Sequence, residues 1–83
     1  STSSQSRKWA EQALSVATGM SDRRAIAALH CWLGEWYWER QSSEDDEKKK
    51  AHRLQKAQEF FQMYSEDAKF MKRYRLHSRL TAD

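Results

Sequence analysis

Hydrophobic positions along the chain recur with the period of an α-helix, most densely between Ala25 and Trp38, which contain three of the four tryptophans. At about 100° per residue, the charged residues of this part of the chain fall into one narrow stripe, and mainly apolar side chains occupy the remaining arc. The stripe consists of Arg24, Glu35 and Glu39, with Ala28 among them. A helix that is apolar on most sides must be covered, either by neighbouring helices or by a partner protein.

The residues before this segment predict a helical hairpin. We expect a first helix from about Ser4 to Thr18, ended by Gly19, and a second helix that starts at Ser21 and Asp22 and continues to about Arg40. Because only Gly19 and Met20 separate them, the two helices should be antiparallel. The face that the first helix is expected to bury consists of Trp9, Ala13, Val16 and Ala17, with Ala10 and Leu14 beside it.

The second half of the chain predicts one or two further helices. After a loop at Gln41 to Ser43, a third helix should begin at Glu44 with Ser43 as its N-cap. Ser65, followed by two acidic residues, is a second cap signature, so our preferred prediction places a fourth helix from Glu66 to about Leu80. One long helix from Glu44 to Leu80 is the alternative, because neither glycine nor proline forces a break. The expected inner stripes are Leu54, Ala57, Phe60, Phe61 and Tyr64, and then Phe70, Tyr74 and Leu80.

Composition supports an all-α fold, a small bundle of three to four antiparallel helices. The 83 residues include no proline and two glycines, and they suit a single domain over residues 1–83, with residues 1–5 as a disordered lead-in. Since the chain begins with Ser1 rather than Met, we expect it to belong to a larger protein. No apolar run approaches the roughly 20 residues of a membrane span, so no membrane contact is predicted. The single cysteine, Cys31, is expected to be a buried structural thiol and favours an intracellular protein, cytoplasmic or nuclear.

Gly34 interrupts the most apolar helix, where glycine costs about 1 kcal/mol relative to alanine. Its presence therefore predicts the close approach of another helix. Ala27 and Cys31 lie on the same side and are also small, and Trp38 is expected to close the end of that contact.

The string Leu33-Gly34-x-x-Tyr37 resembles the leucine, glycine and tyrosine positions in the first helix of a tetratricopeptide repeat. In that family a small residue admits the second helix, whose alanine and aromatic positions would correspond to Ala57 and Phe61. His30 departs from the pattern, since it stands where the family usually has tryptophan. The resemblance implies an α-hairpin scaffold that binds a peptide or helix of another protein.

No combination of residues predicts catalysis, a metal site or a cofactor. The three histidines, His30, His52 and His77, lie on separate predicted helices, and no pair has a metal-ligand spacing. His30 and His77 are expected to be hydrogen-bonded core residues. The acidic run from Glu44 to Glu47 lacks the alternation and the glycine of a calcium loop. We therefore predict that the protein is not an enzyme and carries neither a metal nor a cofactor.

Two surfaces are candidates for binding a partner. Trp32 and Trp36 lie on the edge of the apolar helix that borders its polar stripe, and tryptophan is common in binding hot spots. Lys72, Arg75 and Arg79 align on the final helix, opposite Phe70 and Tyr74, and suit an acidic partner.

The leading functional prediction is a protein-protein interaction module that docks a peptide or helix. One alternative is binding of nucleic acid or an acidic surface through the basic C-terminal helix. The other is homo-oligomerisation, with the apolar helix buried between copies.

Overall fold

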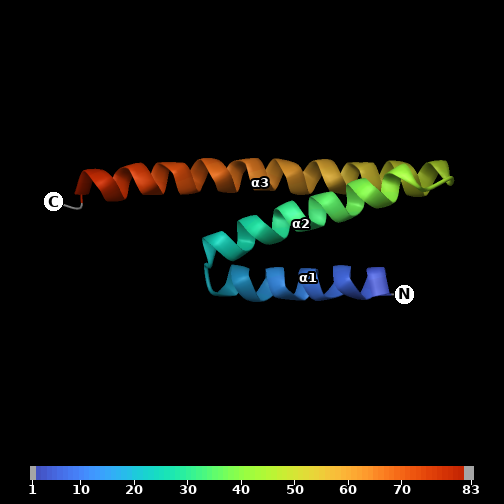
Figure 1. Cartoon of the computed structure of the whole chain (residues 1–83), viewed down its shortest axis with the longest axis horizontal. Coiled ribbons are helices and arrows are strands. Elements are labelled where there is room, and N and C mark those ends of the chain that lie inside the picture. Colours follow the sequence, from blue (N-terminus) through green and yellow to red (C-terminus); the bar gives the residue numbers. More distant parts are fainter. Residues whose placement is uncertain (1, 82–83) are drawn as a thin grey trace.

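Three α-helices form the described part of the chain, in agreement with the all-α prediction. The computed structural model describes the backbone of residues 2–81 and the side chains of residues 4–75. The helices are α1 (Thr2–Gly19), α2 (Arg23–Ser42) and α3 (Glu47–Thr81), and no strand occurs within residues 2–81. α2 lies between the other two, each antiparallel to it, in a molecule of 56 × 20 × 15 Å (Figure 1). Within the described residues, no helix is both long and apolar enough to cross a membrane.

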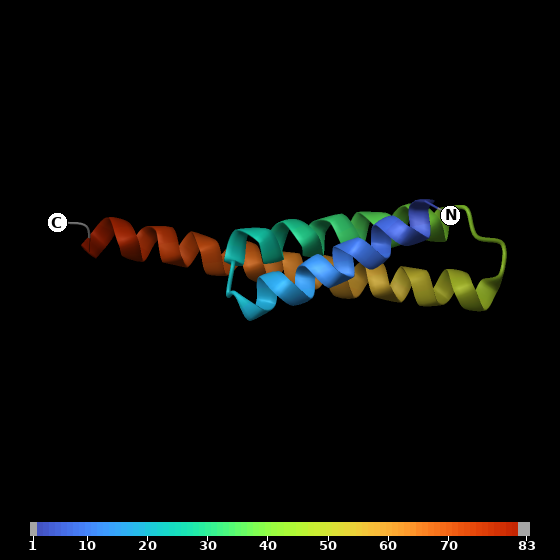
Figure 2. The same ribbon diagram turned by 90° about the horizontal axis from the view of Figure 1, so that it is seen from below.

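α3 is one continuous helix of 35 residues, so the preferred prediction of a break at Ser65 is wrong and the alternative holds. A serine inside a helix costs only a few tenths of a kcal/mol relative to alanine. Asp67 does not act as a cap residue, because its carboxylate contacts His30 of α2. The last part of α3 therefore projects past the start of α2 (Figures 1 and 2). Phe70 and Tyr74 are exposed there instead of buried, since no fourth helix folds back, and the side chain of Leu80 lies outside the described residues.

The turn between α1 and α2 is a Schellman motif with Ser21 in the left-handed conformation, at φ 55°. The backbone N–H of Ser21 donates to the carbonyl of Thr18 (3.1 Å), and that of Asp22 donates to the carbonyl of Ala17 (2.9 Å). Gly19 is the last residue of α1 and does not have a positive φ, so it is not the left-handed residue that we expected to end the helix. The N-cap of α2 is Asp22 alone, whose carboxylate accepts from the N–H of Ala25.

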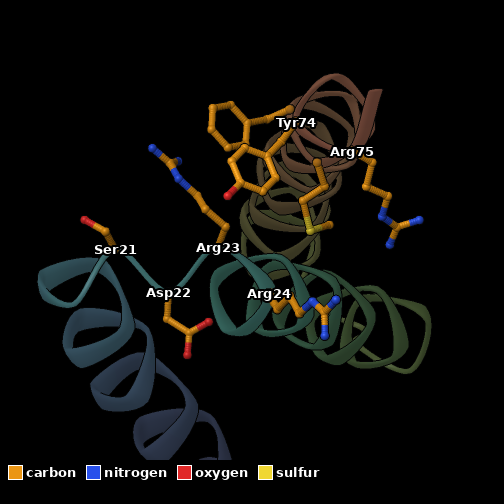
Figure 3. Close-up of a pocket in the computed structure, with 8 residues that line it drawn as sticks. Ser21, Asp22, Arg23, Arg24, Tyr74 and Arg75 are labelled. Atoms are coloured by element: carbon orange, nitrogen blue, oxygen red, sulfur yellow. The ribbon is translucent and has the colours of Figure 1, made fainter. Parts of the chain in front are cut away.

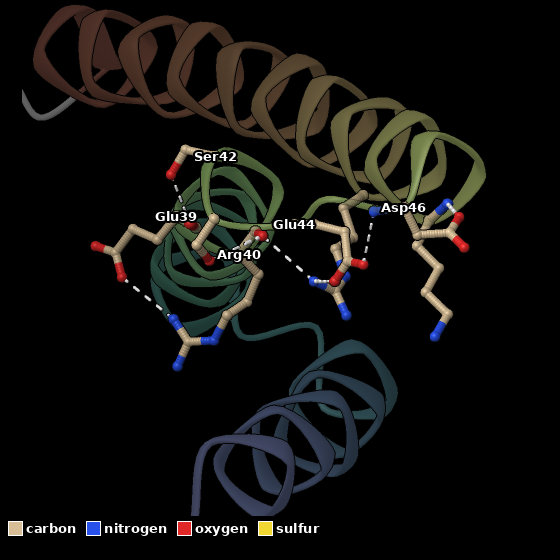
Figure 4. A network of polar contacts seen from close by, with 8 residues as sticks. Glu39, Arg40, Ser42, Glu44 and Asp46 are labelled. Carbon is tan, nitrogen blue, oxygen red and sulfur yellow. Dashed lines mark hydrogen bonds and ion pairs between the residues drawn. The ribbon is translucent and has the colours of Figure 1, made fainter.

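The turn between α2 and α3 includes Glu44 to Asp46, which we expected to be the start of the third helix, whereas α3 begins at Glu47. Ser43 is the C-cap of α2 rather than the N-cap of α3. Asp46 takes the latter role, since its Oδ1 accepts from the N–H of Lys49 at 3.0 Å. Arg53 donates to Glu44 Oε2 at 2.8 Å and to the carbonyl of Arg40 at 3.3 Å, which ties α3 to the end of α2 (Figure 4).

The hydrophobic core lies around the middle of α2. Leu33 and Ala57 are fully buried, and the rings of Tyr37 and Phe60 stack with their centroids 5.9 Å apart. Ala10 of α1 completes this cluster. Because the core draws on all three helices, α1 and α3 cover two sides of α2, as its nearly all-round apolar pattern requires.

The predicted close approach at Gly34 is confirmed. A β-carbon built on Gly34 would come within 2.6 Å of two ring atoms of Phe61, so only glycine fits beneath this ring. Ala27 is buried on the same side, and Cys31 is half-buried rather than buried. Trp38 does not close the contact, since 51% of its surface is exposed.

α1 packs with a different face from the one predicted. The residues turned to the core are Ala10, Leu14 and Ala17, whereas Trp9 and Val16 are more than 60% exposed. Small side chains let α1 lie close to α2, and the same orientation places polar residues of α1 on the aromatic residues of α2. α1 begins at Thr2, so it includes most of the segment expected to be a lead-in, because serine and threonine cost little in a first helical turn.

Candidate functional site

A groove lies where the projecting end of α3 passes the first turn of α2 (Figure 3). Its volume is 470 Å³, and it combines an apolar floor with a rim that carries arginine side chains from both helices. It is lined by Ser21, Asp22, Arg23, Arg24, Phe70, Met71, Tyr74 and Arg75.

The turn before α2 determines where the arginines of this helix point. Ser21, in the left-handed conformation, ends the turn, and Asp22 caps the first turn of α2. Because α2 begins beside α3, its first residue, Arg23, reaches the projecting part of α3. The guanidinium of Arg23 lies 4.4 Å from the centroid of the Phe70 ring, within the range of a cation-π contact. Figure 3 shows Arg23 on the same side of the groove as Tyr74, while Arg24 extends to the other side.

The groove is positively charged and apolar at the same time. Arg23, Arg24 and Arg75 line it, and Lys72 and Arg73 are exposed on the same part of α3. Within its lining, Asp22 is the one acidic side chain, and it already accepts the hydrogen bond that caps α2. The ring of Phe70 is 42% exposed and that of Tyr74 is 65% exposed. This arrangement suits a ligand that has carboxylates beside apolar side chains, because each chemical type finds a complementary group.

The structure gives different positions to the two tryptophans that were predicted to bind a partner. Trp32 is 40% exposed on the surface of α2 and does not line the groove. Trp36 is half-buried between the guanidinium groups of Arg40, at 4.7 Å, and Arg7, at 5.6 Å. It also meets the ring of Tyr37 edge to face. Trp36 therefore serves to join α1 to α2.

The predicted basic residues of α3 also have different positions. Arg75 lines the groove, and it points away from Tyr74 as the helical spacing predicts (Figure 3). Lys72 is exposed but does not line it. The side chain of Arg79 lies outside the described residues.

Arg23 was not among the predicted site residues, although the sequence contains a signal for it. Arg23 and Arg24 follow the N-cap directly, and α2 has no acidic residue in its first turn. Cations at a helix N-terminus oppose the helix dipole, at a cost of about 0.3–1 kcal/mol each when exposed. Two consecutive arginines at this position therefore point to a role outside the helix itself.

The polar residues in the interior are structural. His30 Nδ1 lies 2.6 Å from Asp67 Oδ2, and both side chains are about 85% buried, which confirms His30 as a hydrogen-bonded core histidine. The thiol of Cys31 donates to Glu35 Oε1 at 3.6 Å. Burial and the nearby Glu35 carboxylate raise the pKa of this thiol. His52 is exposed, and the side chain of His77 lies outside the described residues. Among the described residues, no three metal-ligating side chains gather at one point.

No protein family, curated protein or solved structure matches this chain.

Proposed function

We propose that the protein is a non-enzymatic helical interaction module that docks an acidic peptide or helix of another protein in the groove between α2 and α3. The observation that carries the proposal is the Arg23 guanidinium stacked 4.4 Å from the exposed ring of Phe70. Arginine and aromatic residues are the types most enriched in binding hot spots, and here they share one concave surface.

Shape and charge together favour a protein partner. A groove of 470 Å³ accommodates a few side chains, and its apolar floor offers contact area that a phosphate backbone would not use. The net charge of +3 is small for a nucleic-acid-binding domain, and the excess lies mainly at one end of α3. Nucleic-acid binding through the same arginines is the second candidate, since arginine and aromatic side chains also bind single strands.

Homo-oligomerisation through α2 receives less support. α1 and α3 both pack along this helix, and Trp36 is engaged by two arginines. The proposed partner site is therefore the groove, with Trp32 as an exposed residue outside it.

We also propose that α2 and the first half of α3 form a hairpin of the tetratricopeptide-repeat type. The small Gly34 beneath Phe61 supports this proposal, as do the buried Leu33, Tyr37 and Ala57. The long projection of α3 is an addition to such a hairpin. The free thiol of Cys31 favours a reducing, intracellular location, cytoplasmic or nuclear.

The test is a binding titration with a fluorescent amphipathic peptide of leucine and glutamate, beside the same peptide with glutamine in place of glutamate. We expect the acidic peptide to bind and the glutamine peptide to bind at least about tenfold more weakly. The double variant Arg23→Gln/Arg75→Gln should weaken acidic-peptide binding by about tenfold. The matched control is Lys48→Gln/Lys49→Gln, which removes the same charge from exposed positions at the opposite end of α3 and should leave affinity unchanged.

Two results would contradict the proposal. If both double variants weaken binding equally, the attraction is a general charge effect and the groove is not the site. If a single-stranded oligonucleotide binds more tightly than the acidic peptide at about 150 mM salt, the nucleic-acid alternative is the correct one.

A further inference from the structure

The turn between α2 and α3 presents an exposed serine outside both helices. Ser43 is the C-cap of α2, and its Oγ donates to the carbonyl oxygen of Arg40 at 3.3 Å, which is long for a hydroxyl donor. The neighbouring Ser42 still belongs to α2, and its Oγ donates to the carbonyl oxygen of Glu39 at 2.8 Å, an ordinary length (Figure 4). Ser43 therefore has the more weakly bound hydroxyl of the two.

Four acidic residues follow this hydroxyl without interruption, and they are Glu44, Asp45, Asp46 and Glu47. The first three lie in the irregular segment between the helices, and the fourth is the first residue of α3. Glu44 and Asp46 already take part in the hydrogen bonds of the turn. Asp45 and Glu47 are exposed, and no group among the described residues is hydrogen-bonded to or paired with their carboxylates. Two negative charges next to Ser43 are therefore available to another molecule.

The charges around Ser43 favour one class of protein kinase over another. Kinases select their substrates partly by charge, and a basic substrate groove suits a hydroxyl that is followed by carboxylates. An acidic substrate groove instead suits a hydroxyl that is preceded by arginine, and Arg40 does lie three positions before Ser43. However, Arg40 is inside α2, where its guanidinium lies 4.7 Å from the ring of Trp36 and 3.5 Å from a carboxylate oxygen of Glu39. The charges that remain available are the acidic ones.

We propose that Ser43 is a phosphorylation site for an acidophilic kinase, which is a serine/threonine kinase with a basic substrate groove, with ATP as the phosphoryl donor. Ser43 Oγ forms a bond to the γ-phosphorus of ATP, and the bond from that phosphorus to the oxygen bridging the β- and γ-phosphates breaks. ADP leaves with this bond pair, and the hydroxyl proton passes to the catalytic aspartate of the kinase. The exposed position of Ser43 outside the helices allows the in-line approach that this transfer needs.

Arg53 is placed to bind the phosphate that forms on Ser43. The Oγ of Ser43 and the Nη1 of Arg53 are both hydrogen-bonded to the carbonyl oxygen of Arg40, each at 3.3 Å. Because the two groups share one acceptor, a phosphate on this Oγ lies within reach of the guanidinium. Arg53 donates to Glu44 Oε2 at 2.8 Å in the unmodified chain, and a phosphate with a charge of about −1.5 to −2 competes for the same guanidinium. The turn therefore contains both the acids that attract the kinase and a cation for its product.

The test is incubation of the full chain with an acidophilic kinase, magnesium and ATP, followed by tandem mass spectrometry to locate the phosphate. We expect one phosphate per chain, on Ser43. Ser43→Ala should lower the initial rate of phosphate incorporation by at least about tenfold, since it removes the accepting hydroxyl. The matched control Ser42→Ala removes the neighbouring hydroxyl and should keep most of the rate.

A second pair of variants tests the recognition of the acidic residues. Asp45→Asn/Glu47→Gln removes the two available carboxylates and should slow phosphorylation by at least about tenfold. The matched control Glu59→Gln/Glu66→Gln removes the same charge from exposed positions further along α3 and should leave the rate unchanged. All these positions are exposed, so far-UV circular dichroism should show the same helicity in every variant.

Three results would overturn the proposal. The first is a wild-type chain that takes up no phosphate while the same kinase phosphorylates an acidic reference peptide, or that takes it up only on another residue. The second is equal slowing by the two double variants, which would mean that the acids beside Ser43 are not recognised. The third is faster phosphorylation of Ser43 by a kinase with an acidic substrate groove, which would mean that Arg40 is the recognised residue.

Discussion

The ring of Phe61 in α3 lies directly on the backbone of Gly34 in α2. A β-carbon at Gly34 would come 2.6 Å from the Cδ1 and Cε1 atoms of this ring and 3.2 Å from its Cγ. Since the contact includes the base of the ring as well as one edge, rotation of the ring alone does not relieve it. The contact sets how closely the two longest helices approach each other.

Gly34→Ala should therefore destabilise the protein, although alanine is the better helix former by about 1 kcal/mol. Overpacking costs about 1–3 kcal/mol, so we expect a net loss of about 1 kcal/mol in chemical denaturation. In a Phe61→Ala background the same substitution should instead stabilise, because the ring is gone and only the helix propensity remains. A loss of the same size in both backgrounds would show that Phe61 is not the cause.

The contact between His30 and Asp67 should contribute strongly to stability. Both side chains are about 85% buried, and hydrogen bonds to charged groups contribute about 1.5–3 kcal/mol. A double-mutant cycle with His30→Ala and Asp67→Ala should give a coupling energy in this range. The control cycle uses Glu66 and Lys69, whose side chains are 60% exposed, and its coupling should stay below about 0.5 kcal/mol. Equal couplings in the two cycles would contradict this assignment.

In the turn between α1 and α2, Ser21 has the left-handed conformation that the sequence suggests for Gly19. Gly19→Ala should stabilise by about 0.5–1 kcal/mol, because Gly19 is helical and nothing lies within 4 Å of an added β-carbon. Ser21→Val should destabilise by about 1 kcal/mol or more, since a β-branched residue is strained at a φ of 55°. Thermal denaturation of both variants measures this, and a destabilising Gly19→Ala would mean that Gly19 provides the left-handed residue.

Alkaline conditions should destabilise the protein partly through Tyr37. Burial, and after it the charge of Glu11, raises the pKa of Tyr37 above its usual value of 10.0. Its contribution to stability is therefore fully present below about pH 10 and is lost as the pH rises through the higher pKa of the folded state. Unfolding free energies between about pH 8 and pH 11.5 should fall less steeply in Tyr37→Phe. Both proteins should also carry Cys31→Ala. The raised pKa of the Cys31 thiol likewise makes the free energy of unfolding fall as the pH rises, and this fall begins at a lower pH than that of Tyr37.

Cys31 should react slowly with alkylating reagents. Burial, together with the charge and hydrogen bond of Glu35, raises the pKa of the thiol above 9.0, and the thiolate is the reactive form. Glu35→Gln should lower this pKa and speed the reaction with iodoacetamide at about pH 8 by a fewfold. Glu39→Gln is the control, since its carboxylate lies one turn further along α2 and makes no contact with the thiol. Equal rates in wild type and Glu35→Gln would argue against the influence of Glu35.

Several features of the fold were predictable from the sequence because they depend on local spacing. The nearly all-round apolar pattern between Ala25 and Trp38 predicts a central helix, and α2 does lie between α1 and α3. A glycine inside a helix predicts a close contact, and Phe61 makes that contact with Gly34. The apolar surroundings of His30 predict a hydrogen-bonded core histidine, and its bond to Asp67 confirms this.

The continuity of α3 depended on a contact between residues far apart in the sequence. Ser65, Glu66 and Asp67 are compatible with a helix start and with a helix interior alike. Asp67 contacts His30, 37 positions away, which places Asp67 against α2 as part of an uninterrupted helix. Local spacing carries no information on such a pairing.

The orientation of α1 and the groove were likewise decided by tertiary structure. Hydrophobicity alone favours burying Trp9 and Val16, but the alanine side of α1 approaches α2 more closely and brings Glu11 to Tyr37. Arg23 and Phe70 meet only because one turn starts α2 beside the projecting end of α3. By itself, the sequence determined which segments are helical and which helix is central, because those depend on periodicity. Which faces remain exposed for partners was decided by the tertiary structure, because that depends on how closely the helices can pack.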